Sequence, residues 1–253
     1  MRQFITLTIT LLITSLLTAQ SLQRNNVDAE QLFKDSIVTK PSFLKKEIVP
    51  ICLAATSLTI MAIPNLKEKI QPNLNWNNQL NNPNYIDLGD DYVRYAPAVA
   101  AYALSALGLK SKHRFIDRSV ILTVAYITSD FVVHNTKNLT KVARPNNDAF
   151  NSFPSQHVAV AFIAASFLDH ELGYISPWIP VGGYLAAGYV AYARVARNAH
   201  WTSDVLMGAA VGITMTNLSY WAYDKIMSTF PKNLTLTPII DNQQTGLYVC
   251  YRF

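Results

Sequence analysis

Histidines, cations and a carboxylate stand in three short clusters in the second half of the chain. In chain order the clusters are Lys137-x6-Arg144-Pro145, Pro154-Ser155-Gln156-His157 and Arg194-x5-His200-x3-Asp204. Each begins or ends at the edge of an apolar segment, where a buried polar group is unfavourable unless it has a partner. Such clusters indicate a site for a polar substrate.

The third cluster has the spacing of a nucleophile and the residue that orients it. His200 and Asp204 are four residues apart, so they share one face if a helix includes both. A carboxylate bonded to one imidazole nitrogen fixes the tautomer and leaves the other nitrogen free to attack. The alternative is a pair that only caps a helix, and these two residues alone do not decide between them.

The other clusters add groups suited to a phosphate dianion. Arginine can grip phosphate oxygens with two hydrogen bonds, and lysine supplies a point charge. Phosphoryl transfer depends mainly on positioned cations, because its transition state spreads charge over the equatorial oxygens. Ser155 and the backbone N–H groups of a helix start add donors, and His157 can protonate a leaving oxygen. Cations on a membrane face would explain the lysines but not two well-placed histidines.

The three motifs together resemble the pattern K-x6-R-P, P-S-G-H and S-R-x5-H-x3-D. Type-2 phosphatidic acid phosphatases (PAP2), bacterial class A acid phosphatases and vanadium haloperoxidases share it. The resemblance covers roughly residues 47–225, and three spaced motifs in the right order make it specific.

The resemblance implies a role for each matching residue. His200 would be the nucleophile that forms a phosphohistidine, Asp204 would orient it, and His157 would be the general acid. No metal or other cofactor is implied. The phosphate would be held by Lys137, Arg144, Arg194, Ser155 and Gln156.

The sequence departs from the family pattern at two positions. Gln156 stands where the family has glycine, and Ala193 where it has serine. Glycine would let the backbone approach the phosphate, whereas glutamine either crowds the pocket or supplies an amide donor. Neither change removes a group that makes or breaks bonds, so rate and substrate preference are affected rather than reaction class.

Six apolar segments without two-residue alternation predict an all-α, six-helix bundle of the PAP2/haloperoxidase type. Gly208 and Gly212, four apart, would let two helices approach closely. Residues 234–253 predict a short C-terminal β-hairpin. The helical segments are Ile48–Ile63, Tyr95–Leu109, Ser119–Val133, His157–Leu168, Pro177–Tyr192 and Val205–Tyr223.

The remaining segments suggest the domain organisation. Residues 1–19 have the layout of a secretory signal, with an uncleaved anchor as the alternative. Residues 20–46 are a polar connector, 47–232 the helical domain and 233–253 the tail. The Asn-, Pro- and Asp-rich stretch Lys67–Arg94 predicts a long surface loop. Cys52 and Cys250 fit neither a disulfide framework nor a zinc site.

Composition bears on location and partners. Hydrophobic residues make up 50% of the 253 residues and charged residues 15%, so much apolar surface is buried in protein or lipid. The net charge of +5 suits an anionic substrate or lipid headgroups, and no nucleic-acid motif is present. The basic segment Lys110–Arg118 would face the cytoplasm, turning the motifs outward. A cleaved signal followed by six spans would give the opposite orientation.

We therefore expect a membrane-embedded phosphatase of the cell envelope with its active site facing the periplasm or the outside. Its substrate would be a phosphorylated lipid: phosphatidate, a polyprenyl diphosphate or lipid A. The alternatives are a soluble, secreted periplasmic acid phosphatase, a vanadate-dependent haloperoxidase and an inactive envelope scaffold. The pattern does not specify an oligomeric state.

Overall fold

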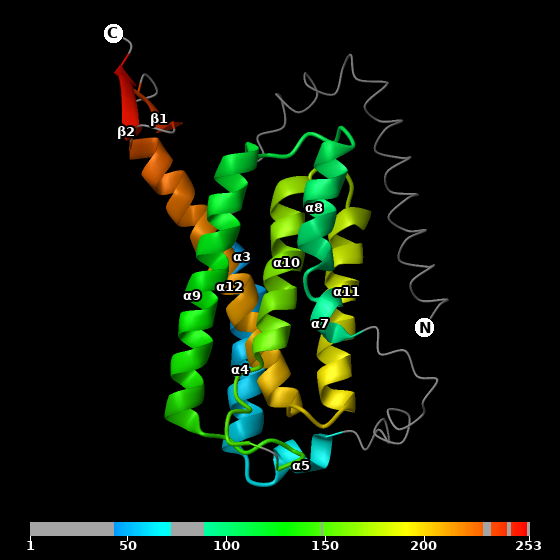
Figure 1. The fold of residues 1–253 in the computed structure, drawn as a ribbon. Coiled ribbons are helices and arrows are strands. Elements are labelled where there is room, and N and C mark those ends of the chain that lie inside the picture. Colours follow the sequence, from blue (N-terminus) through cyan, green and yellow to red (C-terminus); the bar gives the residue numbers. More distant parts are fainter. Residues whose placement is uncertain (1–42, 72–88, 148, 230–233, 242–243, 252–253) are drawn as a thin grey trace.

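A computed structural model describes residues 43–71, 89–147, 149–229, 234–241 and 244–251. The predicted signal segment, nearly all of the connector and residues 72–88 of the predicted loop lie outside these ranges. Within them the chain forms a helical bundle (Figure 1). The elements are α3 Phe43–Lys46, α4 Ile48–Ala62, α5 Leu66–Ile70, α7 Asp90–Val93, α8 Ala96–Ala106, α9 Phe115–Thr140, α10 Gln156–Leu172, α11 Trp178–Ala196, α12 Thr202–Thr229, β1 Leu234–Asp241 and β2 Gln244–Tyr251.

Each of the six predicted helices is present, as α4 and α8 to α12, but α9 to α12 extend beyond their predicted ends, and α9 and α12 extend furthest. In α9 the extra turns are polar and bond to their own helix. Asn135 Nδ2 donates to the Phe131 carbonyl and Thr140 Oγ1 to the Thr136 carbonyl. Such bonds satisfy polar side chains without apolar packing, so hydrophobicity alone underestimated the helix.

The prediction of a surface loop over Lys67–Arg94 is wrong at both ends of the segment. The short helix α5 occupies Leu66–Ile70, and α7 occupies Asp90–Val93. Helix α7 packs against α11 and α10. Its first residue, Asp90, is fully buried.

Helix α10 is the centre of the bundle and packs against α8, α9, α11 and α12. Fully buried alanines on α10 let its neighbours come close. On α12, a Cβ at Gly208 would lie 2.6 Å from the Ser155 carbonyl oxygen, and Gly212 packs as tightly on the Ala159 backbone. The close approach predicted from these two glycines is therefore confirmed.

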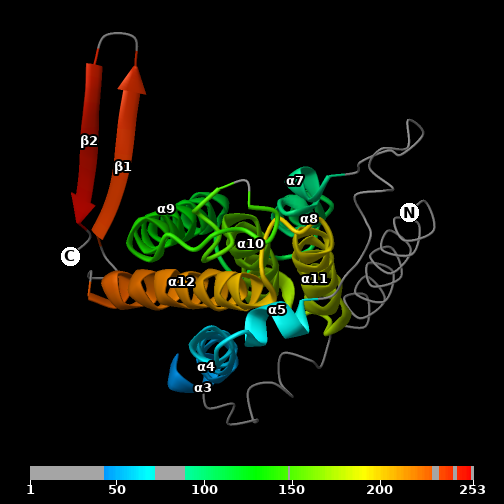
Figure 2. The same cartoon turned by 90° about the horizontal axis from the view of Figure 1, so that it is seen from below.

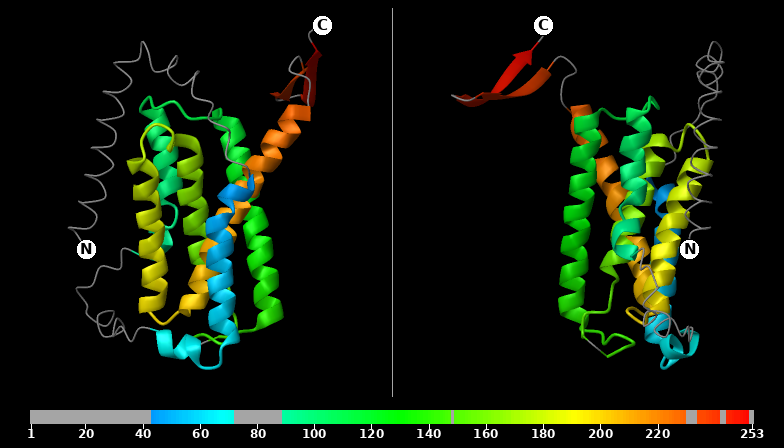
Figure 3. Two further views of the ribbon diagram at one scale, coloured as in Figure 1. Left: turned by 180° about the vertical axis from the view of Figure 1, so that it is seen from behind. Right: turned by 45° about the vertical axis from the view of Figure 1, so that its right-hand side comes forward.

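The chain direction brings four helix ends together. The C-terminal ends of α9 and α11 and the N-terminal ends of α10 and α12 lie at one end of the bundle, which we call the motif end (Figures 1 and 2). Helix α4 runs along α12 on one side of the bundle (Figure 3). Since every sequence motif stands at one of these ends, the fold gathers all three motifs.

After α12 the strands β1 and β2 pair antiparallel, with Leu234 opposite Tyr251. Within the described ranges, no helix is both long and apolar enough to cross a bilayer. Membrane embedding stays a prediction.

Candidate active site

The predicted site residues all stand at the motif end. Lys137 lies in the last turn of α9 and Arg144 in the loop that follows. Ser155 precedes α10, and Gln156 and His157 are its first two residues. The remaining residues are Arg194 in the last turn of α11, His200 between α11 and α12, and Asp204 in the first turn of α12.

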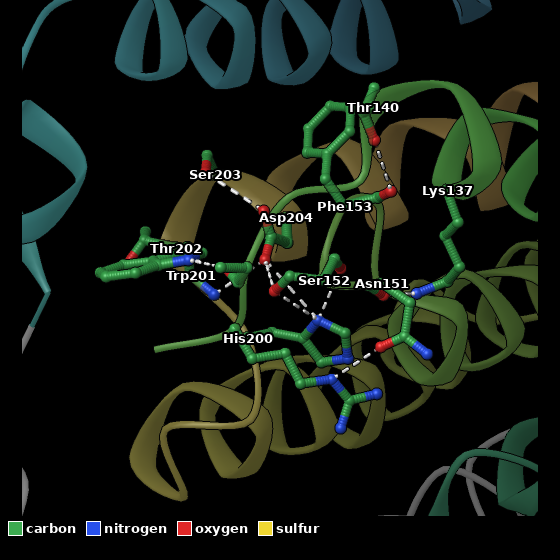
Figure 4. A network of polar contacts seen from close by, with 12 residues as sticks. Lys137, Thr140, Asn151, Ser152, Phe153, His200, Trp201, Thr202, Ser203 and Asp204 are labelled. Carbon is green, nitrogen blue, oxygen red and sulfur yellow. Dashed lines mark hydrogen bonds and ion pairs between the residues drawn. The ribbon is translucent and has the colours of Figure 1, made fainter. Parts of the chain in front are cut away.

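His200 is buried and held in a defined orientation (Figure 4). Its Nδ1 lies 2.8 Å from the carbonyl oxygen of Ser152. Because a carbonyl oxygen only accepts, Nδ1 carries the proton and Nε2 keeps its lone pair. Burial lowers the pKa of His200 to about 4, so the imidazole is neutral at pH 7. A neutral, oriented imidazole is the form in which histidine acts as a nucleophile.

Asp204 lies beside His200, but the two residues are not related by a shared helix face. Helix α12 begins at Thr202, so His200 precedes the helix and shares no helical face with Asp204. Their closest atoms, Nδ1 and Oδ2, are 3.7 Å apart. Asp204 Oδ2 instead accepts hydrogen bonds from the Trp201 backbone N–H at 2.9 Å and from the Ser152 hydroxyl. The carboxylate thus fixes both segments that position His200. The negative charge of Asp204 also lies close to the imidazole ring.

Lys137 and Arg144 are joined by Asn151, which the sequence reasoning did not identify. Lys137 Nζ donates to the Asn151 carbonyl oxygen, and Arg144 Nε donates to Asn151 Oδ1 at 3.0 Å. Burial, followed by the nearby charge of Arg144, lowers the pKa of Lys137 to about 8. Most of the lysine is therefore still charged at pH 7.

Arg194 is anchored by an acid from the segment predicted as a loop. Its Nη1 lies 3.0 Å from Asp90 Oδ2, and Arg197 Nη1 lies 2.7 Å from Asp90 Oδ1. Sequence reasoning missed both Asp90 and Arg197. The available signal was the consecutive pair Asp90-Asp91 directly before an apolar segment.

His157 and Gln156 also have acidic partners. His157 Nε2 lies 2.8 Å from Asp91 Oδ1, and Gln156 Nε2 donates to Asp130 Oδ1 at 3.0 Å. Burial lowers the pKa of His157, and the neighbouring charge of Arg194 lowers it further. The Gln156 amide is thus engaged by α9 through Asp130.

Arg194 connects the separate parts of the site electrostatically. Its charge lies close enough to lower the pKa of His200 and of His157, and it acts on Lys137 as well. Ser155 Oγ is buried and has no hydrogen-bond partner within the described part of the chain. Together these groups form a cationic site with spare donors beside a neutral imidazole, which suits an anion that reacts with a nucleophile.

Comparison with known proteins agrees with this chemistry. Residues 118–228 match the model of the PAP2 superfamily. The Lipid A 1-phosphatase of Porphyromonas gingivalis is 34% identical over 138 residues, which are 54% of this chain and 31% of that protein. The match thus spans less than a third of the length of this curated relative. No solved structure matches the chain.

Proposed function

Because the chain carries a PAP2 superfamily domain over residues 118–228, we propose that it is a phosphatase that hydrolyses a phosphate monoester or diphosphate on a lipid, with His200 as nucleophile. The observation that carries the proposal is the state of His200. Its proton is held on Nδ1 by the Ser152 carbonyl, and burial keeps the ring neutral. The lone pair on Nε2 is then available within the field of Lys137 and Arg194.

The proposed reaction has two steps. In the first, Nε2 of His200 attacks phosphorus, the bond from phosphorus to the leaving oxygen breaks, and His157 gives that oxygen a proton. In the second, water attacks the phosphohistidine, His157 takes a proton from the water, and the P–N bond breaks to release phosphate. Lys137, Arg144 and Arg194 stabilise the charge on the equatorial oxygens in both steps. Ser155 Oγ supplies a further hydrogen bond.

A lipid substrate is supported by the relative and by the surface. The relative's name states that it removes the 1-phosphate of lipid A. Helices α4, α9 and α11 carry large apolar side chains in exposed positions, which suits contact with acyl chains. On these helices the exposed residues include Ile48, Val49, Ile51, Leu58, Val120, Val124, Ile127, Phe131, Trp178, Val181, Leu185 and Tyr192. Phosphatidate, a polyprenyl diphosphate and lipid A are the candidate substrates.

We place the enzyme at a membrane of the cell envelope, with the motif end facing the periplasm or the outside. The basic connection before α9 supports this orientation, because it lies at the end of α9 opposite Lys137. Flotation with lipid vesicles tests the membrane contact. Protein that stays at the bottom of the gradient, with rapid turnover of small phosphate esters without detergent, would favour a soluble acid phosphatase instead.

The test of the function is phosphate release from the three candidate lipids in detergent micelles. We expect wild-type protein to release phosphate from at least one lipid and His200→Ala to lose the activity by at least about 1,000-fold. His134→Ala is the matched control, because it removes an exposed histidine of α9. Turnover by His200→Ala at the wild-type rate would refute the mechanism.

A further inference from the structure

Asp91 makes a contact with the proposed general acid that no sequence motif predicts. Its Oδ1 lies 2.8 Å from Nε2 of His157, although the two residues are 66 positions apart. The carboxylate comes from α7 and the imidazole from the first turn of α10. Asp91 also lies outside the residues 118–228 that match the family model.

The neighbouring residue gives Asp91 a fixed place. Asp90 is fully buried and binds Arg194 and Arg197 at the end of α11. These two ion pairs hold the first turn of α7 against α11, so the backbone of Asp91 is fixed beside the site. The Asp91 side chain itself is 60% exposed and that of His157 is 25% exposed. The contact therefore lies at the solvent-facing side of the site, where a leaving group would depart.

The charges around His157 oppose one another. Burial disfavours its protonated form, and so do the guanidinium groups of Arg194 and Arg94. The hydrogen bond to Asp91 and the charge of Asp90 favour that form. The same hydrogen bond to His157 lowers the pKa of Asp91, so Asp91 is a carboxylate at neutral pH. A general acid must carry its proton before it can donate it, so the acidic partners act in the direction that catalysis requires.

We infer that Asp91 is a positioning residue whose carboxylate orients the His157 imidazole and favours its protonated form for transfer of a proton to the leaving oxygen. The inference deepens the proposed function and rests on it. A stabilising role alone would be a minor one, because exposed ion pairs contribute little to folding. The distinguishing property lies in the first step, in which the loss of Asp91 should slow departure of the leaving group mainly when that group needs a proton.

The activity test compares two synthetic lipid phosphates that share an alkyl chain. One is an alkyl phosphate, whose leaving alkoxide needs a proton, and the other is a nitrophenyl phosphate, whose leaving phenolate needs almost none. For Asp91→Asn in the full chain we expect release of the alcohol from the alkyl ester in a single turnover to slow about 10-fold or more, and release of nitrophenol from the aryl ester to stay within about 2-fold. The basic limb of the alkyl-ester pH profile should move to lower pH, and Asp91→Glu should restore part of the rate.

Asp117→Asn is the matched control, because Asp117 forms an ion pair with Arg114 at the other end of the bundle. Equal losses on both esters, or no loss on either, would overturn the inference. A second readout needs no activity: NMR titration of the His157 ring should give a lower pKa in Asp91→Asn than in wild type. An unchanged titration would contradict the inference, whereas wild-type protein inactive on every lipid phosphate would refute the proposed function.

Discussion

The two ends of α10 carry polar clusters built from similar residues but arranged differently. The motif cluster surrounds Ser155, His157 and His200. The other, which we call the distal cluster, consists of Glu47, His113, His170, Glu171, Asn217 and Tyr220. In the distal cluster Glu171 Oε1 accepts from His113 Nδ1 at 2.8 Å and from Tyr220 at 2.7 Å.

The distal cluster satisfies its own polar groups. His170 stacks on Tyr220, with ring centroids 4.1 Å apart, and its Nε2 lies 2.8 Å from Asn217 Oδ1. Asn217 Nδ2 in turn donates to Glu47 Oε1 at 2.8 Å. The motif cluster instead leaves the Ser155 hydroxyl and Nε of Arg194 without partners in the described part of the chain. Complete internal pairing indicates a structural network, whereas spare donors among cations indicate a site for an anion.

The variant expected to separate the two clusters most clearly is Arg144→Ala, which should lose activity. Arg144 bonds to the Asn151 side chain, and its loss removes one of the three cations proposed to stabilise the transition state. We expect kcat/KM for the lipid substrate to fall by about 100- to 1,000-fold, as for loss of one preorganised donor. Steady-state kinetics with a thermal melt checks this, and Lys141→Ala, which removes a cation at the end of α9, is the control. A large drop in Tm with unchanged kcat/KM would show that the motif cluster has a structural role instead.

The second prediction concerns Glu171→Ala in the distal cluster. The change leaves the buried Tyr220 hydroxyl and the His113 ring without their acceptor. We expect the free energy of unfolding to fall by about 2–4 kcal/mol and the activity of the folded protein to stay within about 2-fold. Urea denaturation followed by kinetics on the folded protein measures both. A loss of activity without a loss of stability would contradict a purely structural role for the distal cluster.

The third prediction is a loss of stability in acid that depends on His170. Burial lowers the pKa of His170 to about 4, while the unfolded chain has a histidine pKa near 6.5. The unfolded state thus binds the proton more tightly, so stability is highest above pH 6.5 and falls as the pH drops toward 4. His170→Gln should remove up to about 3 kcal/mol of this dependence.

Urea denaturation at a series of pH values tests the third prediction. His200 has a similarly lowered pKa, so some acid sensitivity should remain in the variant. A wild-type protein whose unfolding free energy is constant from pH 6.5 to 4 would contradict the buried neutral state of both rings.

The smallest effect is expected from Gln156→Gly, which installs the residue of the family pattern. The Gln156 amide is bonded to Asp130, an exposed contact. We expect turnover to change by less than about 3-fold and stability to fall by about 0.5–1 kcal/mol, because glycine is unfavourable in a helix. A gain in turnover of 10-fold or more would show that Gln156 obstructs the phosphate.

Much of the fold followed from local sequence, and the site only in part. Long apolar segments predicted the six helices, and motif spacing identified the residues at their ends. Asp90, Asp91, Asn151 and Ser152 were missed because their contacts are tertiary. Nothing in the spacing of Asp91 and His157 connects them, and a segment rich in Asn, Pro and Asp resembles a surface loop. The direct partner of His200 is a backbone carbonyl, a group that carries no sequence signal at all.

The central claim is that His200 attacks phosphorus, and its most direct test is to trap the intermediate. Wild-type protein would be mixed with the lipid phosphate that it hydrolyses and quenched in alkali within milliseconds. Its peptides would then be mapped by mass spectrometry under conditions that preserve phosphohistidine. We predict one phosphoryl group on the peptide that carries His200, and none in His200→Ala. A phosphoryl group on another residue, or full turnover by His200→Ala, would contradict the account.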